Sequence, residues 1–446
     1  MTSPGTASVK QLSLPLVPPE DEARPGSRRS DAPVCFPNLL ERALERSNMF
    51  RALRRVRHNK GAPGVDGMTV EELPGYLATH WPEIRAALLN GSYRPQPVLR
   101  KEIPKPGGGI RELGIPTVLD RLIQQALAQV LQTEWDRFFS RFSFGFRPRR
   151  SAHQAIACAQ QFLREGYDWV VDLDLERFFD RVVHEVLMAR VKRRIADPNA
   201  LKLIDRYLKS GVMIGTMLEP TEEGVPQGGP LSPLLANLLL DDLDRELESR
   251  GHRFVRYADD ISIYVGSQRA GERVLASVTR FLEKRLKLRV NLEKSAVDRP
   301  WRRVLLGFTF VGREFRRRVS DKALKALRFT VKQTTRRTRG VSFRSLLSGL
   351  GKTLRGWLSY YGFNEVPNPL REVEKWIRRR LRCYLWKQWG RRGYRELKRR
   401  GVSVGLAWNT AKSAHGPWRL SQSPALTIAL PANYFRRLGL PNLVNG

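Results

Sequence analysis

The sequence is poor in cysteine and histidine, the residues from which disulfide scaffolds and many metal sites are built. Only three cysteines occur in 446 residues, at Cys35, Cys158 and Cys383, and no two of them form a Cys-x-x-Cys pair. The six histidines show no metal-ligand spacing. Disulfide scaffolding and a cysteine-rich zinc module are therefore not expected, and a reducing, intracellular setting fits the composition.

The sequence also lacks long apolar runs. A membrane-spanning helix needs roughly 20 consecutive apolar residues, and no stretch approaches that length. Residues 1–34 contain proline, serine and acidic side chains, but neither a signal-peptide core nor the acid-poor bias of a transit peptide. We therefore expect a disordered leader, no membrane partner and a cytoplasmic location.

Acidic residues are scarce, with 44 against 79 lysines and arginines, which gives a net charge of +35. Residues 301–400 carry 29 basic and 6 acidic residues, and residues 401–446 carry four basic and no acidic ones. Such a surplus opposes compaction unless a polyanion neutralises it. Nucleic acid is the expected partner, with the C-terminal third as its main electrostatic surface.

Against this basic background, Tyr-Ala-Asp-Asp at residues 257–260 stands between two apolar, β-rich runs. Two adjacent carboxylates at the tip of a hairpin repel each other, so folding stability gives little reason to place them there. A bound divalent cation would supply that reason. An ordinary acidic turn is the alternative, because aspartate favours turns and solvent.

A second acidic strand supports the metal interpretation. In Val-Val-Asp-Leu-Asp-Leu at residues 170–175, the strand period of two places Asp172 and Asp174 on one face and apolar side chains on the other. If this strand lies beside the hairpin, Asp174, Asp259 and Asp260 form an oxygen-rich site suited to two Mg²⁺ ions. Two such ions suit phosphoryl transfer, since one activates the attacking hydroxyl and the other neutralises the leaving pyrophosphate.

Two other segments are candidates for binding a nucleotide. Lys105 and Arg111 bracket a glycine-rich turn between two predicted strands, where both cations could contact a triphosphate. An exposed basic hairpin is the alternative. Gln227 lies in the proline- and glycine-rich loop 225–233, ahead of an apolar helix predicted for residues 230–247. A plain connection between loop and helix is the alternative there.

These elements, in this order, resemble the reverse transcriptases encoded by group II introns, the intron maturases. Residues 174–180 resemble polymerase motif A, 226–237 motif B, 257–260 motif C, 292–295 motif D and 306–308 motif E. Residues 59–67 and 142–148 are similar to segments of the family's fingers, and residues 354–361 to its thumb, called domain X. The resemblance covers about residue 36 to the C-terminus and points to the compact bacterial members.

The resemblance implies an α+β fold of the right-hand polymerase type, with fingers, a palm built on an antiparallel sheet, and a helical thumb. The implied divisions are the leader (1–34), N-terminal helices and fingers (35–165), the palm (166–312), the basic thumb (313–400) and a C-terminal extension (401–446).

The resemblance also implies roles for individual residues. Asp174 and Asp259 would be the principal catalytic metal ligands, with Asp260 the third acidic member and the backbone carbonyl of Leu175 a further ligand. Asp172 is extra to the motif and expected to be secondary.

At the substrate end, Lys105 and Arg111 would bind the triphosphate of the incoming dNTP. Gln227 would line the nucleotide pocket, and Lys294 would lie near the triphosphate. The ring of Phe179 would exclude a ribose 2′-hydroxyl, with neighbouring Phe178 as the alternative gate. The side chains expected to bind RNA are Arg355, Tyr360, Tyr361, Arg378, Arg379 and Arg380.

The resulting hypothesis is an RNA-directed DNA polymerase that binds its group II intron RNA, assists splicing and copies the RNA into DNA from a DNA primer during intron mobility. Because no paired cysteines of a His-Asn-His endonuclease follow the thumb, we expect insertion into single-stranded or nicked target DNA by a bacterial enzyme associated with the nucleoid or a ribonucleoprotein. The alternatives are a relative recruited to a host role such as phage defence, a splicing-only RNA-binding maturase, and an RNA-dependent RNA polymerase, which the aromatic gate opposes. The sequence does not indicate an oligomeric state.

Overall fold

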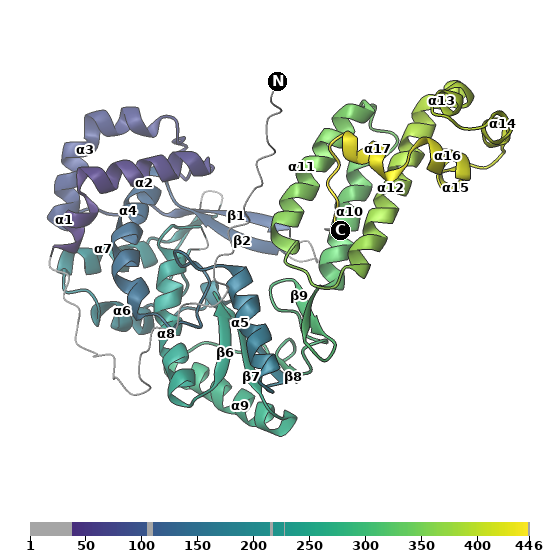
Figure 1. Ribbon diagram of the computed structural model, residues 1–446. Coiled ribbons are helices and arrows are strands. Elements are labelled where there is room, and N and C mark those ends of the chain that lie inside the picture. Colours follow the sequence, from purple (N-terminus) through teal and green to yellow (C-terminus); the bar gives the residue numbers. More distant parts are fainter. Residues whose placement is uncertain (1–37, 105–109, 215–216, 227, 445–446) are drawn as a thin grey trace, which may run out of the picture. The chain divides into compact units, whose positions relative to one another are not determined.

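The computed structural model describes residues 38–104, 110–214, 217–226 and 228–444, with the backbone but not the side chain of Arg111. Its chain forms two compact units that divide between Arg299 and Pro300 (Figure 1). The expected leader, together with Lys105 and Gln227, lies outside the described residues.

The first unit begins with a helical layer. Its helices are α1 (Leu39–Ala43), α2 (Arg46–Asn59), α3 (Leu73–Leu89), α4 (Val118–Trp135) and, later in the chain, α7 (Pro198–Leu208). Ala52 and Val56 of α2 pack against Leu122 and Ala126 of α4, so the two helices bury a shared apolar stripe. The helical spacing of apolar residues in 120–139 predicts a helix there, and α4 confirms it, starting two residues earlier at Val118 and ending at Trp135.

A small sheet extends from this layer, with strands in the order β2-β1-β4-β5. The strands are β1 (Val98–Pro104), β2 (Ile110–Ile115), β4 (Val212–Ile214) and β5 (Met217–Glu219). β1 and β2 pair antiparallel, and Ile103 lies opposite Arg111. The two predicted strands around the glycine-rich turn are therefore confirmed.

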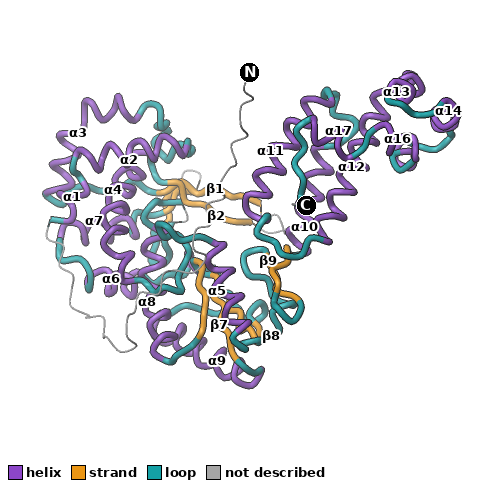
Figure 2. The backbone as a smooth tube through the Cα atoms, viewed as in Figure 1, coloured by secondary structure: helices purple, strands orange, loops and turns teal. Residues whose placement is uncertain are grey.

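A second sheet carries the acidic segments (Figure 2), and all of its pairings are antiparallel, in the order β6-β7-β3-β8. The strands are β3 (Trp169–Leu173), β6 (Arg253–Tyr257), β7 (Asp260–Val265) and β8 (Ala296–Asp298). The helices α5 (Ala152–Arg164) and α9 (Gln268–Phe281) pack on these strands, and α8 (Ser232–Ser249) contacts β6. The predicted hairpin, the predicted strand and the apolar helix are all present.

One predicted helix begins later than expected. The helical spacing of apolar residues in 178–195 predicts a helix over that range, but Phe178–Asp180 form only a 3-10 turn and α6 (His184–Lys192) starts after it. The intervening chain is used differently, because the carbonyl of Val182 accepts from Gly224 and Val183 bridges Glu223. Tertiary pairing with a distant segment overrides the local helical preference.

The second unit joins a short hairpin to a set of basic helices. The hairpin is β9 (Phe308–Val311) and β10 (Arg316–Val319). The first of these strands lies within residues 166–312, the expected palm, and belongs to the second unit. The helices are α10 (Asp321–Thr334), α11 (Phe343–Tyr361), α12 (Asn368–Trp389), α13 (Gly393–Arg399), α14 (Val404–Lys412), α15 (Pro417–Leu420), α16 (Pro424–Ala429) and α17 (Ala432–Arg437).

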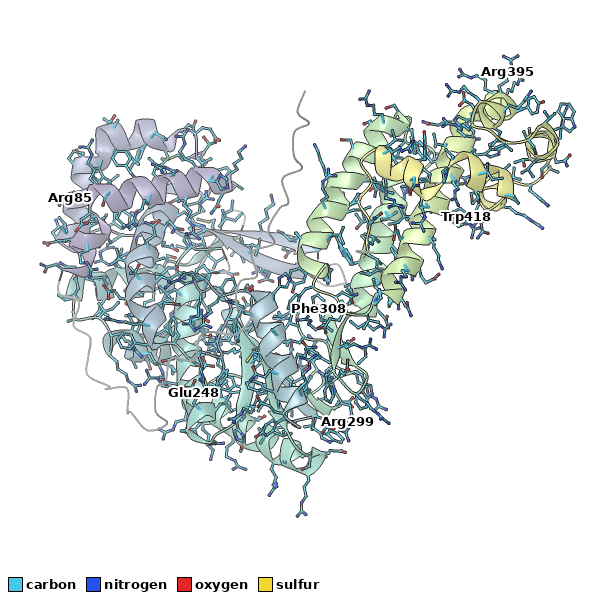
Figure 3. The ribbon with its side chains drawn as sticks, in the orientation of Figure 1. Arg85, Glu248, Arg299, Phe308, Arg395 and Trp418 are labelled. Carbon is cyan, nitrogen blue, oxygen red and sulfur yellow. The ribbon has the colours of Figure 1, made fainter. Side chains whose placement is uncertain are left out.

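The apolar residues of 371–385 recur at helical spacing, and the core of this unit follows that stripe on α12, since Val373, Ile377 and Leu381 are all buried. Phe308 is fully buried and lies within 6.4 Å, between ring centroids, of the rings of Tyr360, Tyr361 and Phe363 (Figure 3). None of the helices in the described ranges is long and apolar enough to span a membrane.

Candidate active site

The two acidic segments meet at neighbouring strands. β3 and β7 pair antiparallel with Leu173 opposite Ile261 and Asp172 opposite Ser262. Continuing that register by one residue sets Asp174 beside Asp260. The alternation on β3 is as predicted, because Val171 and Leu173 are buried whereas Asp172 and Asp174 are partly exposed.

Asp259 lies in a two-residue turn between β6 and β7, since Tyr257 pairs directly with Asp260. The other turn residue, Ala258, has a φ of 59°, in the left-handed region. Two-residue hairpins favour positive φ because such turns match the twist of the strands, but an alanine there is strained. Local backbone strain of this kind is concentrated at functional sites.

The electrostatics of Asp260 show that the carboxylates are close together. Its pKa is raised to about 6, first because surrounding protein atoms desolvate the carboxylate and then because of repulsion from Asp259, Asp172 and Asp174. The side chain is nevertheless open to solvent at the surface. An accessible group of mutually repelling carboxylates is what a divalent cation stabilises.

Asp174 is fixed by the segment that resembles motif D. Its backbone N–H donates to Ser295 Oγ at 3.0 Å, and its carbonyl accepts from the N–H of Asn291 at 2.8 Å. Lys294 Nζ lies 3.7 Å from Asp174 Oδ2. The structure thus brings Lys294, expected near the triphosphate, to the edge of the acidic group.

The direction of the Leu175 carbonyl follows from the backbone hydrogen bonds of its two neighbours. Asp174 O and Glu176 N both bond the segment at residues 289–291, on the β8 side of the chain. Because carbonyls alternate in direction along an extended chain, that of Leu175 is directed to the opposite side, where β7 lies.

The possible metal ligands of this site are carboxylate oxygens and one backbone carbonyl. In the described part of the chain, no group of three or more His, Cys, Asp or Glu is already closed around a metal-sized point. Mg²⁺ does not require such a cage, because it keeps several waters and binds through one or two carboxylates plus substrate phosphates. The clustered carboxylates and the Leu175 carbonyl therefore fit hard cations bound together with substrate.

The aromatic pair beside the acidic group is asymmetric. Phe178 is buried in the core at 3% exposure, whereas Phe179 is only partly buried, and their ring centroids are 5.1 Å apart. The Phe179 carbonyl accepts from Val225 N at 2.6 Å, which ties the pair to the loop of residues 225–233. Of the two rings, that of Phe179 is the accessible one.

The predicted nucleotide-binding residues are described only in part. Lys105 and Gln227 are outside the described residues, and of Arg111 only the backbone on β2 is described. The loop that contains residue 227 nevertheless touches β2, because a Cβ built at Gly228 would lie 2.3 Å from Gly114 O. The structure thus places that loop against the strand that carries Arg111.

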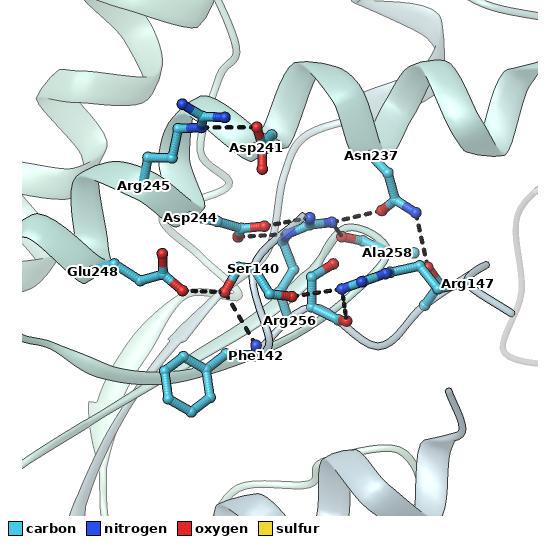
Figure 4. A network of polar contacts seen from close by, with 12 residues as sticks. Ser140, Phe142, Arg147, Asn237, Asp241, Asp244, Arg245, Glu248, Arg256 and Ala258 are labelled. Carbon is cyan, nitrogen blue, oxygen red and sulfur yellow. Dashed lines mark hydrogen bonds and ion pairs between the residues drawn. The ribbon is translucent and has the colours of Figure 1, made fainter. Parts of the chain in front are cut away.

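A buried polar network under the turn was missed by the sequence analysis (Figure 4). Arg256 on β6 and Asp244 on α8 are both fully buried and form a two-pronged ion pair. Arg256 also donates to Asn237 Oδ1 and Ala258 O, and Asn237 donates to Gly145 O. Two features of the sequence could have indicated this network. One is an arginine, Arg256, among the apolar residues of a strand, and the other is a pair of polar residues, Asn237 and Asp244, seven positions apart on an apolar helix.

In the second unit, the expected RNA-binding arginines have partners within the protein. Arg380 donates to Thr335 Oγ1 at 2.6 Å, and Arg378 pairs with Glu374 at 2.7 Å. The guanidinium of Arg379 stacks 3.8 Å from the ring centroid of Trp418 (Figure 3).

The other three expected RNA-binding residues also make internal contacts. Arg355 donates to Gly439 O at 3.4 Å, and Tyr360 donates its hydroxyl to Leu306 O at 2.7 Å. Tyr361 stacks on Trp357 with centroids 4.6 Å apart. All six side chains therefore have contacts within the second unit, and that of Arg378 lies within α12.

A pH dependence follows from the raised pKa of Asp260. Above pH 6 the carboxylate is ionised and free to bind a cation, whereas below pH 6 a proton competes for it. The Kd for Mg²⁺, measured by calorimetry on the ion-free protein, should therefore rise about fourfold from pH 7.5 to pH 5.5. The Asp260→Asn variant should lose this dependence, and an unchanged Kd in the unaltered protein would contradict it.

Comparison with known proteins decides the family. Residues 103–310 match the reverse transcriptase (RNA-dependent DNA polymerase) family, and residues 324–401 match the group II intron, maturase-specific domain. Protein YkfC of Escherichia coli is 32% identical over 358 residues, which cover 71% of this chain and 93% of YkfC. The chain belongs to the group II intron reverse transcriptases.

Two further proteins match a smaller share of this chain than YkfC does. The group II intron-encoded protein LtrA of Lactococcus lactis is 35% identical over 211 residues, which cover 47% of this chain and 35% of LtrA. A chain of a solved partial Cas6-RT-Cas1–Cas2 complex is 27% identical, with a TM-score of 0.36, over 55% of this chain and 42% of that chain.

Membership in the family makes this chain an RNA-directed DNA polymerase with a maturase domain. A reverse transcriptase of this family uses a nucleic-acid template and primer and a divalent metal. The matched region contains Asp174, Asp259 and Asp260, and the maturase-specific match falls within the basic helices of the second unit.

Proposed function

We propose that this enzyme binds a group II intron RNA, assists its splicing and copies it into DNA during intron mobility. The observation that carries the proposal is the antiparallel register that sets Asp174 beside Asp260, with Asp259 in the adjoining turn. A maturase-specific domain inside a region with a net charge of +23 supports the RNA-binding part.

In this proposal, Asp174, Asp259, Asp260 and the Leu175 carbonyl hold two Mg²⁺ ions. When bound, these ions supply activation of the primer 3′-hydroxyl and neutralise charge on the departing pyrophosphate. Lys294, 3.7 Å from Asp174, is placed to contact a phosphate and to balance the acidic group. The segments 35–165, 166–312 and 313–400 act as fingers, palm and thumb.

The incoming dNTP would be held from the side of β2. We assign its triphosphate to Lys105, which follows β1 in the sequence, and to Arg111 on β2, and the edge of its pocket to Gln227. The contact between the loop at Gly228 and Gly114 of β2 supports a shared site for these segments. Holding the reactants in line is the protein's main contribution to a reaction of this type.

The accessible ring of Phe179 is proposed to exclude ribonucleotides. Phe179→Ala should reduce the preference for dNTP over NTP by about 10–200-fold, because the ring would no longer fill the space of the 2′-hydroxyl. The measurement is kcat/KM for each nucleotide on the same primer and RNA template. Phe178→Leu is the matched control: its ring is buried, so stability should fall while the preference remains.

Intron RNA is proposed to bind the second unit through its basic helices. The internal partners of Arg378, Arg379 and Arg380 leave other faces of these planar groups for phosphates, and Tyr361 offers a partly exposed ring. Such binding is dominated by phosphate contacts, so affinity should fall steeply with salt.

The test is incorporation of labelled dNTP on an RNA template with a DNA primer and Mg²⁺, together with a binding assay on the RNA that flanks the gene. Incorporation and tight, salt-sensitive binding of a folded intron RNA are expected. Incorporation without binding of any intron RNA would favour the host-recruited role. Binding without incorporation would favour the splicing-only role.

A further inference from the structure

A fully buried ion pair lies directly under the turn that carries Asp259. Arg256 Nε and Nη2 donate to the two carboxylate oxygens of Asp244 at 2.7 and 2.5 Å, and both side chains are 0% exposed. A buried pair gives folding little advantage over apolar side chains of similar volume. Its presence here therefore calls for an explanation beyond stability.

The third nitrogen of the guanidinium, Nη1, donates a hydrogen bond to the backbone of the turn. Arg256 Nη1 donates to Ala258 O at 3.0 Å and to Asn237 Oδ1 at 2.9 Å. The Ala258 carbonyl belongs to the peptide group that joins Ala258 to Asp259. The arginine thus fixes the plane of the backbone immediately before the first carboxylate of the site.

The other side of the turn rests on Gly145. A Cβ built at Gly145 would lie 2.3 Å from Ala258 N and 2.9 Å from the carbonyl carbon of Tyr257, and both atoms are backbone. Such atoms cannot rotate away, so this close approach requires glycine. Asn237 Nδ2 donates to Gly145 O at 2.8 Å, so one side chain on α8 connects both supports of the turn.

The segment before Gly145 is itself joined to β6. Phe144 N donates to Arg256 O at 2.8 Å, and Arg256 N donates to Phe142 O at 2.9 Å. The turn, whose Ala258 has a φ of 59°, is therefore held between the 142–145 segment and α8 (Figure 4). A disfavoured backbone conformation persists where its surroundings over-determine it.

We propose that Arg256 is a positioning residue for the metal-binding carboxylates and that it acts through the Ala258–Asp259 peptide, with Asn237 and Gly145 as its supports. The inference rests on the proposed role of Asp259 and Asp260 in holding Mg²⁺. Mg²⁺ demands near-ideal octahedral geometry, so a small displacement of Asp259 weakens ion binding and slows the chemical step. Binding of the dNTP, assigned to other segments, should change little.

The test compares Arg256→Lys with a matched control, Arg190→Lys. Lysine keeps the charge beside Asp244 but cannot bond Asp244, Asn237 and Ala258 O together in one plane. We expect Arg256→Lys to lower kcat about 10–100-fold and to raise the Mg²⁺ concentration for half-maximal activity several-fold, with KM for dNTP within about twofold. Arg190, on α6, pairs at 3.0 Å with Asp242, which lies on α8 as Asp244 does. This pair is away from the turn, so the lysine variant of Arg190 should keep wild-type values of kcat and Mg²⁺ requirement.

The possible results separate the positioning role of Arg256 from the proposed function of the enzyme. A folded Arg256→Lys enzyme with wild-type kcat and Mg²⁺ requirement would overturn the positioning role. If that variant does not fold, Asn237→Ala, which leaves the ion pair intact, replaces it: a higher Mg²⁺ requirement supports the role and a wild-type requirement overturns it. A wild-type protein that incorporates no dNTP would refute the proposed function itself, and the inference with it.

Discussion

Asp259→Asn is expected to lower dNTP incorporation on an RNA template by about 10³-fold or more, because losing a metal ligand removes several kcal/mol of transition-state stabilisation. The amide has the size of the carboxylate, so packing of the turn should be preserved. Removing one charge also relieves the repulsion that helps to raise the pKa of Asp260. The melting temperature should therefore not fall, and binding of intron RNA by the basic helices should survive.

The matched control is Asp172→Asn, which removes a carboxylate from the same face of β3. Asp172 lies opposite Ser262, two residues further from the turn than Asp174. We expect its variant to keep most of the activity. If Asp259→Asn lost the fold and RNA binding together, the carboxylates would be structural, and if it polymerised normally they would not be ligands.

Asp244→Ala is expected to reduce the free energy of unfolding by about 3–5 kcal/mol, because it leaves the guanidinium of Arg256 buried and uncompensated. The side chain of Arg256 is 0% exposed. The measurement is urea unfolding of the whole chain, followed by a probe in the first unit. A loss below about 1 kcal/mol would mean that water or a neighbouring group compensates the charge.

Two further variants separate the ion pair from its surroundings. Asp242→Ala removes a carboxylate from the same helix, but its pair with Arg190 is partly exposed, so the loss should be about 1 kcal/mol or less. Replacing both partners, as Asp244→Leu with Arg256→Met, should restore most of the stability. Polymerase activity should remain low in that double variant, since nothing then holds the Ala258 carbonyl.

The acidic strand and hairpin could be predicted because strand periodicity is local information. Alternation in residues 170–175 already separates Asp172 and Asp174 from the apolar face, and the same apolar face dictates the register against β7. The apolar helix predicted for residues 230–247 is present as α8, because its apolar run is likewise local information. The late start of α6 could not be seen, because it depends on pairing with residues 223–224, some forty positions away.

The support beneath the turn could not be predicted from the sequence, because it too depends on contacts between distant segments. Arg256 meets Asp244 and Asn237, and Asn237 meets Gly145, only after three segments have come together, and an arginine in a strand is more often exposed. The arginines of α12 show the complementary difficulty. Their spacing indicated a basic face, but not that Arg379 would stack on Trp418 or that Arg380 would bond the end of α10.

The central claim is that Asp174, Asp259 and Asp260 together hold the ions of a polymerase. The most direct measurement is a crystal structure of the enzyme with primer, RNA template, dNTP and Mn²⁺, in which anomalous scattering locates the metal. We expect two anomalous peaks, from two Mn²⁺ ions bound by Asp174 and Asp259, with Asp260 and the Leu175 carbonyl beside them. Metal bound elsewhere in a complex that extends its primer, with these carboxylates unliganded, would contradict it.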